Sequence, residues 1–477
     1  MLSTAVALVL STAVALVLST SQLGLALQVQ HQLALVPFER VTDTPRSYQV
    51  PRQGQFNPPS EIHVQAVLLP ASEGPKRHGD HSVDKEMLEA LKTHSDPVDA
   101  LVALRPKMAT ALAEPRLLHV FGEREARWMT EGDKLRLRRQ KKKFMDITDH
   151  HEFYAQEKKQ ATTSVAGKAN LPALTHQNLV KPLFPHISTS RMREVVAHMT
   201  SYYTRWYGGT HGEMSSEWLR DHIAQIIDAA QFGTHISLEY FTHPFPQSSI
   251  IARFEPKIRN ASHPLTILGA HQDSANYVFP LLPAPGADGD CSGSVSILET
   301  FRVLAESGYT PKTGPVEFHW YAAEEGGLLG SQAIDCAVQE GTGAEDRGHD
   351  GVSFIGRNAT ESIGLVATQA DAPLTNWTIQ LSKEYISIPA KIYEMAEQAG
   401  SDYMSYTQLG YPATFATEGD PMHNGFPGDM DPYVHGVNDT MDIDDETGYF
   451  SFDHMARFAE LGIAFAVEQA GWDNKWR

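Results

Sequence analysis

Two adjacent glutamates, Glu324 and Glu325, stand between a β-strand pattern and a glycine-rich turn. Residues 316–321 are rich in β-formers, and Gly326-Gly327 permits a sharp exit into the helix expected from Leu328. Neighbouring side chains at a strand end point in different directions, so one carboxylate can bind a metal ion while the other faces a water on that metal. Because an acidic pair alone is more often a solvated turn, this interpretation depends on the rest of the chain.

Two histidines have a spacing that suits metal binding. His271 follows the apolar strand pattern 265–270, and Asp273 stands where a carboxylate commonly holds the second ring nitrogen of a metal-bound histidine. His435 lies in the acidic, turn-rich segment 431–440. Histidine is the commonest metal ligand near neutral pH, but either histidine taken alone is more often structural.

The loop 285–293 is acidic and flexible, and it runs into a helical pattern over 292–305. It carries Asp288 and Asp290 on either side of Gly289. Taken alone, this segment is equally well interpreted as a loop that caps the following helix.

In chain order, these four segments resemble the secreted fungal leucine aminopeptidase branch of the di-zinc metallo-exopeptidases, which are bacterial leucyl aminopeptidase-like. The typical pattern of that family is His-x-Asp, Gly-Ala-Asp-Asp-Asp-x-Ser-Gly, Glu-Glu-x-Gly-Leu-x-Gly-Ser, an aspartate and a late histidine. The resemblance covers about residues 170 to 470, with further matches at residues 174–177, 245–250, 401–402, 410–412 and 451–455.

The resemblance implies that His271, Glu325 and His435 are zinc ligands, that Glu324 is the general base and that Asp273 orients His271. Two zinc ions would lower the pKa of a shared water, polarise the scissile carbonyl and bind the free α-amine of a peptide. The implied protein is a secreted zinc aminopeptidase, made as a zymogen, that removes leucine or other apolar residues from the N-termini of peptides.

Three departures from the family pattern qualify this expectation. Gly289 occupies the position of the carboxylate that bridges the two metals, so a slip of the loop would have to bring Asp288 or Asp290 into its place. Spacing makes Asp350 the aspartate expected after the glutamate pair, although the residues before it have no strand character. Gln398 stands where the family has a carbonyl-polarising tyrosine. The sequence therefore leaves open whether the chain binds two zinc ions or one.

The same departures support a second hypothesis from a different class. The chain would then be a family member with an impaired metal site that acts as a binding protein, or the product of a faulty gene model. The intact pair Glu324-Glu325 and the two histidines favour the enzyme, whereas Gly289 favours the alternative.

The composition fits a secreted acidic enzyme. The chain has 58 Asp and Glu against 39 Lys and Arg, a formal net charge of −19, which argues against nucleic acid as a partner. Apolar residues make up 42% of the chain, enough for a large core. The two cysteines, Cys291 and Cys336, exclude a disulfide-stapled scaffold and leave one pair open. We expect a monomer.

The N-terminus begins with an apolar repeat, because residues 3–10 and 11–18 have the same sequence. We interpret residues 1–26 as a signal peptide, with a retained membrane anchor as the alternative. Entry into the secretory route agrees with four Asn-x-Ser/Thr sequons, at Asn260, Asn358, Asn376 and Asn438.

Residues 27–169 differ in composition and include the dense basic run 134–143. The basic run is followed by Phe-Met-Asp-Ile-Thr at 144–148. With this ending, the region resembles the propeptide of the same aminopeptidases, and we expect it to act as an intramolecular inhibitor that blocks the cleft. The catalytic domain is then expected at 170–477.

Strand and helix patterns alternate within the expected catalytic domain. Helices are expected at 191–207, 213–229, 292–305, 328–338 and 453–469, and strands at 236–241, 250–254 and 265–270. This alternation predicts an α/β fold, a three-layer sandwich with a mixed, mainly parallel central sheet whose strand carboxyl ends carry the ligands.

Overall fold

The computed structural model describes residues 85–151, 171–230, 234–259, 263–338, 344–349 and 351–473. Residues 1–26, interpreted as a signal peptide, lie outside the described part, as does the expected boundary between propeptide and catalytic domain. Both therefore stay predictions.

The architecture is built on an eight-stranded sheet. In spatial order its strands are β11 (Ala390–Tyr393), β10 (Ile363–Val366), β12 (Ala413–Glu418), β8 (Ala344–His349), β6 (Leu265–His271), β7 (Val316–Tyr321), β5 (Ser249–Phe254) and β4 (Ile236–Phe241). The central pairs β7–β6, β6–β8 and β8–β12 are parallel, and antiparallel pairs flank them. All residues of β6 and β7 are buried, as expected of central strands covered on both faces.

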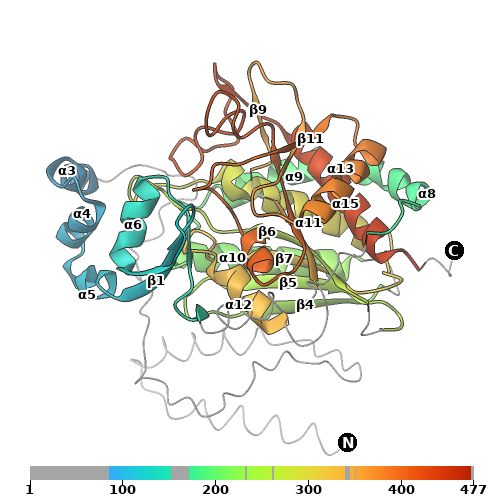
Figure 1. Ribbon diagram of the computed structural model, residues 1–477, viewed down its shortest axis with the longest axis horizontal. Coiled ribbons are helices and arrows are strands. Elements are labelled where there is room, and N and C mark those ends of the chain that lie inside the picture. Colours follow the sequence, from blue (N-terminus) through green and yellow to red (C-terminus); the bar gives the residue numbers. More distant parts are fainter. Residues whose placement is uncertain are drawn as a thin grey trace, which may run out of the picture. The chain divides into compact units, whose positions relative to one another are not determined.

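Helices cover both faces of this sheet, so the predicted three-layer α/β sandwich is confirmed (Figure 1). One face carries α9 (Thr189–Met199), α10 (Thr210–Asp228), α11 (Gly293–Glu306), α13 (Ala372–Tyr385) and α15 (Phe452–Ala470). The other face carries α12 (Leu329–Val338) and α14 (Tyr403–Gln408). Short elements complete this part: α8 (Gln177–Val180), η2 (Lys181–His186), η3 (Ala287–Ser292) and the two-stranded sheet β9 (Phe354–Gly356) with β13 (Gly448–Phe450).

Two expectations about secondary structure were wrong. The segment before Asp350 lacks a strand pattern in sequence, yet Ala344–His349 forms β8 in the middle of the sheet. Its main chain pairs with β6 and β12, so hydrogen bonds from distant segments override weak local propensity. The helix expected at 191–207 ends at Met199, and the chain then turns so that Trp206 and Tyr207 lie in a loop.

Residues 85–151, called the N-terminal segment below, have a helical and a β-sheet part and belong to the same compact unit as the large sheet. The segment contains α3 (Lys85–Thr93), α4 (Pro97–Leu104), η1 (Pro106–Met108), α5 (Ala109–Leu112), α6 (Glu131–Arg139) and a three-stranded sheet of β1 (Pro115–Val120), β2 (Arg127–Thr130) and β3 (Phe144–Asp146). Thr130 and Asp133 form a reciprocal capping box that starts α6. The basic run 134–143 is therefore mostly helix.

The N-terminal segment shares apolar and polar contacts with the rest of the fold. Its buried residues Leu101, Met108 and Leu135 belong to one hydrophobic cluster with Phe279 and Leu282, which follow β6. The Asp146 amide also donates to the Gly327 carbonyl at 3.0 Å. The segment thus reaches the glycine-rich turn that follows the glutamate pair.

None of the helices in the described ranges is long and apolar enough to cross a membrane.

Candidate active site

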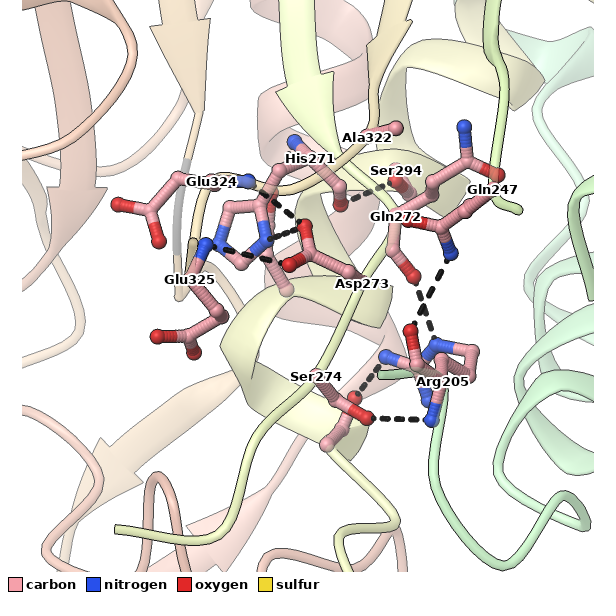
Figure 2. Close-up of polar contacts among 12 residues, drawn as sticks. Arg205, Gln247, His271, Gln272, Asp273, Ser274, Ser294, Ala322, Glu324 and Glu325 are labelled. Carbon is pink, nitrogen blue, oxygen red and sulfur yellow. Dashed lines mark hydrogen bonds and ion pairs between the residues drawn. The ribbon is translucent and has the colours of Figure 1, made fainter. Parts of the chain in front are cut away.

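The turn after β7 places Glu324 and Glu325 at the carboxyl end of the sheet. The Asp273 carboxylate fixes this turn by accepting hydrogen bonds from the backbone amides of Glu324, at 3.0 Å, and Glu325, at 3.1 Å. Both glutamates are buried, and their carboxylates lie on the same side of the turn (Figure 2). Both are within 3.4 Å of one lysine ammonium, so they converge instead of diverging as the sequence predicts.

His271 ends β6 beside this turn. Its ring Nδ1 lies 3.3 Å from Asp273 Oδ1, so Asp273 contacts both the histidine and the glutamate backbone. Arg205 supports the same segment from below, because its guanidinium donates to the Gln272 carbonyl at 2.9 Å (Figure 2). The geometry suits the predicted role of Asp273 as the residue that orients His271.

His435 reaches the same place from the C-terminal loop. Its Nε2 lies 2.9 Å from Glu325 Oε1, and its backbone has a φ of 64°, a left-handed conformation that is uncommon for residues other than glycine. Burial alone would raise the pKa of Glu325, but the charges of His435 and Lys143 outweigh it and hold that pKa well below its usual value. The structure therefore brings His271, Glu324, Glu325, Asp273 and His435 together.

Asp288 and Asp290 both accept hydrogen bonds from groups that surround their loop. Asp290 Oδ2 accepts from the His271 amide at 3.1 Å, and its Oδ1 accepts from the Gly293 amide at 2.9 Å at the start of α11. Asp288 Oδ1 accepts from the backbone and side chain of Ser353 at 3.1 and 2.5 Å. Each aspartate thus holds the loop in place around Gly289.

Sequence reasoning missed two acidic residues next to this loop and site. Asp439 accepts from the amides of Asp288, at 2.7 Å, and Gly289, at 3.2 Å, and burial followed by the charge of Asp288 raises its pKa to about 7. Asp402, at the start of α14, is buried, and burial followed by the charge of Glu324 raises its pKa well above the usual value. Asp402 lies in the Ser-Asp match at 401–402, which was the available signal.

A lysine side chain of the N-terminal segment contacts the carboxylates of both glutamates. The Lys143 ammonium lies 3.0 and 2.9 Å from the two carboxylate oxygens of Glu324 and 3.4 Å from Glu325 Oε2. The backbone of Lys143 is held on both sides, by the Gln398 carbonyl and the Phe121 amide. Arg138 adds a second anchor, because its guanidinium donates to the Glu325 carbonyl.

The donor set fits zinc, which takes imidazole nitrogen and carboxylate oxygen. His271, Glu325 and His435 supply these atoms, and the buried Asp402 adds a carboxylate close enough to feel the charges of Glu324 and His271. Among the same residues, no group of three or more His, Cys, Asp or Glu side chains has metal-binding geometry.

The remaining predicted residues are accounted for as follows. Asp350 and Asn260 lie outside the described residues. Asn358, Asn376 and Asn438 are exposed. Cys291 is a buried free thiol and Cys336 a half-buried one, so the pair left open by the sequence is not formed.

The fold gathers carboxylate and imidazole side chains at the carboxyl end of a mixed sheet, which is where enzymes of this α/β class place their active sites. A family model for "Peptidase family M28" matches residues 249–459. Leucine aminopeptidase 1 of Chaetomium globosum is 37% identical over 361 residues, covering 73% of this chain and 84% of that protein. The protein of the same name from Neurospora crassa is 36% identical over 356 residues, covering 72% and 83%.

The crystal structure of the Legionella pneumophila LapA aminopeptidase shares the fold. It has a TM-score of 0.61 and 24% identity, and the match covers 76% of this chain and 96% of that one. The chain belongs to peptidase family M28. The predictions of this family and of a peptidase acting on N-terminal residues are confirmed.

Proposed function

We propose that the chain is a secreted zinc aminopeptidase, made as a zymogen, that removes leucine or other apolar residues from the N-termini of peptides. One observation carries this proposal: Asp273 ties His271 to the backbone of Glu324-Glu325, and His435 contacts the second glutamate. The preference for leucine is supported by the names of the fungal relatives.

The chain's own residues divide the work. His271, Glu325 and His435 would hold zinc, with the carboxylate of Asp402 close by. When bound, zinc supplies Lewis-acid activation of a water and of the scissile carbonyl. Glu324, on the same turn as Glu325, accepts the proton of the attacking water and returns it to the leaving amine. Asp273 holds the glutamate turn and the His271 ring in a fixed relative position.

The N-terminal segment is the folded part of the proposed propeptide. Its Lys143 places a primary ammonium group on the carboxylates that face the reaction, where the free α-amine or a metal would otherwise compete for them. Phe121 and Gln398 hold the Lys143 backbone, so the side chain is directed at Glu324 by main-chain hydrogen bonds. Inhibition would end when residues up to about 169 are removed.

Processed protein should hydrolyse leucine p-nitroanilide and leave N-acetyl-leucine p-nitroanilide intact, because an aminopeptidase requires a free amine. Removing zinc with a chelator should abolish the activity, and added zinc should restore it. Equal hydrolysis of the two substrates, or none of either in zinc-loaded processed protein, would contradict the proposal.

A second candidate is a metal-impaired family member that acts as a binding protein. It is favoured by Gly289, which has no carboxylate, and by the hydrogen bonds through which Asp288 and Asp290 hold the loop around it. Fewer than one zinc per processed chain, together with no hydrolysis, would support this reading.

A further inference from the structure

Tyr277 closes a ring of contacts with Glu325 and His435. Its hydroxyl donates to Glu325 Oε2 at 2.8 Å, while His435 Nε2 lies 2.9 Å from Glu325 Oε1. The rings of Tyr277 and His435 stack with centroids 3.7 Å apart and an interplanar angle of 6°. Each of the three side chains therefore contacts the other two.

The backbone of Tyr277 is fixed independently of these side-chain contacts. Its amide donates to the His435 carbonyl at 3.0 Å, which ties it to the left-handed residue of the C-terminal loop. The side chain of the preceding Asn276 accepts from the Val278 amide at 3.0 Å and donates to the Pro283 carbonyl at 2.9 Å. Tyr277 is thus held by a local turn and by a residue far along the chain.

The Tyr277 phenol acts as a hydrogen-bond donor here, because its hydroxyl donates to Glu325 Oε2 at 2.8 Å. A protonated hydroxyl can fix one carboxylate oxygen of Glu325 while leaving the other for a metal. Gly289 has no carboxylate that could bridge two metals, and the side chain of Gln398 is exposed. Neither residue can therefore fix the orientation of Glu325 and His435.

We infer that Tyr277 is a positioning residue that holds Glu325 and His435 in a fixed relative orientation for metal binding. The hydroxyl sets the rotation of the carboxylate, and the stacked ring sets the plane of the imidazole. The two ligands come from segments more than a hundred residues apart in sequence, so a third side chain that touches both lowers the entropy cost of bringing them together. This inference rests on the proposed zinc peptidase function.

Two variants separate the two contacts of Tyr277. Tyr277→Phe removes the hydroxyl and keeps the stacked ring, whereas Tyr277→Leu removes both. Tyr433→Phe is the matched control, because Tyr433 lies in the same loop as His435 but its hydroxyl donates to Asp445 at 2.6 Å. Zinc affinity is measured by competition with a chromophoric chelator, and kcat and KM are measured with leucine p-nitroanilide on processed protein.

Loss of a side chain that orients a metal ligand weakens metal binding by about 10- to 100-fold. We expect this loss in Tyr277→Phe, with a lower kcat, a nearly unchanged KM and an unchanged melting temperature of the zinc-free protein. Tyr277→Leu should lose more, and Tyr433→Phe should match the unaltered chain. A purely structural role would instead lower the melting temperature of the zinc-free protein without separating kcat from KM.

The outcomes distinguish this inference from the proposed function. If the unaltered chain binds zinc and hydrolyses the substrate, and Tyr277→Phe equals it in zinc affinity and kcat, the inference on Tyr277 is wrong and the function stands. If the unaltered processed chain neither binds zinc nor hydrolyses the substrate, both are overturned.

Discussion

The ammonium group of Lys143 is shared almost equally by the two carboxylate oxygens of Glu324, at 2.9 and 3.0 Å, although the residues are 181 positions apart. Lys143 is 15% exposed in its side chain and Glu324 is fully buried, so the pair is partly shielded from solvent. A folded segment from before the peptidase domain therefore neutralises the residue expected to move protons during catalysis.

Replacing Lys143 by Met in the uncleaved chain should increase zinc affinity and hydrolysis. If the N-terminal segment and zinc compete for the glutamates, each weakens the other by the same factor, typically about 5- to 150-fold. Zinc binding to the uncleaved chain, measured by chelator competition, should tighten by a factor in that range. Lys141→Met is the control, because Lys141 is exposed and lies in the same basic run. Equal affinities in both variants would refute the competition.

Replacing Glu324 by Gln should preserve the fold and zinc content of the processed enzyme and remove its turnover. Glutamine keeps the size and polarity of the side chain but cannot accept the proton of the attacking water, and loss of a general base costs about 100- to 10,000-fold in rate. Leucyl anilide hydrolysis and metal analysis of the same sample test this. Near-normal hydrolysis would refute the assignment of Glu324 as the base.

Restoring a carboxylate at position 289 requires space as well as charge. A Cβ on Gly289 would lie 2.9 Å from Val434 Cγ1, closer than real side chains approach. Gly289→Asp with Val434→Ala should therefore raise zinc content toward two per chain and increase turnover, whereas Gly289→Asp alone should gain less and destabilise the loop. If the unaltered protein already binds two zinc ions and the double variant changes nothing, the missing-bridge hypothesis is wrong. Asp288→Ala and Asp290→Ala would then show which aspartate replaces it.

Lys134 should be essential for the stability of the N-terminal segment against unfolding. Its ammonium is buried between Asp146, at 2.6 Å, and Glu131, at 2.9 Å. Breaking a buried ion pair by removing one partner costs about 3–5 kcal/mol, so Lys134→Met should unfold this segment at lower urea concentration. Lys92→Met is the control, because its pair with Glu89 is exposed and should contribute little. Limited proteolysis over a urea series measures the difference.

The same pair predicts a weakening of the N-terminal segment in acid. Burial opposes ionisation of Asp146, but the charge and hydrogen bond of Lys134 outweigh it and hold the pKa of Asp146 below its usual value of 3.8. A carboxylate whose pKa is lowered by folding contributes stability above its unfolded pKa, and this contribution is lost as the pH falls through the folded pKa. The urea midpoint of the segment should be constant above about pH 5 and fall below about pH 4. A midpoint that rises on acidification would contradict this.

The sequence predicted most of the fold because its elements have strong local patterns. The strand expected at 236–241 is β4 with the same bounds, and the helix expected at 453–469 is α15 extended by one residue at each end. β8 was missed because its charged and glycine-containing sequence becomes a strand only between β6 and β12. The stability of β8 comes from its pairing with distant strands, and a local sequence pattern does not reveal such pairing.

The site divides in the same way. The glutamate pair, His271 and His435 were found because residue type and spacing carry the chemistry. Tyr277 and Lys143 were missed as site residues because their importance lies in long-range contacts, to His435 in one case and to Glu324 in the other. The basic run around Lys143 led to the prediction of a propeptide, which stays a prediction, but its spacing does not say which lysine reaches the glutamates.

The hydrophobic cluster that Phe279 and Leu282 share with Leu101, Met108 and Leu135 has a consequence for the proposed processing. If the N-terminal segment is removed as proposed, Phe279 and Leu282 lose the apolar side chains that cover them, just after Tyr277 in the chain. The processed form should then bind apolar peptides and apolar surfaces more strongly than the uncleaved chain does.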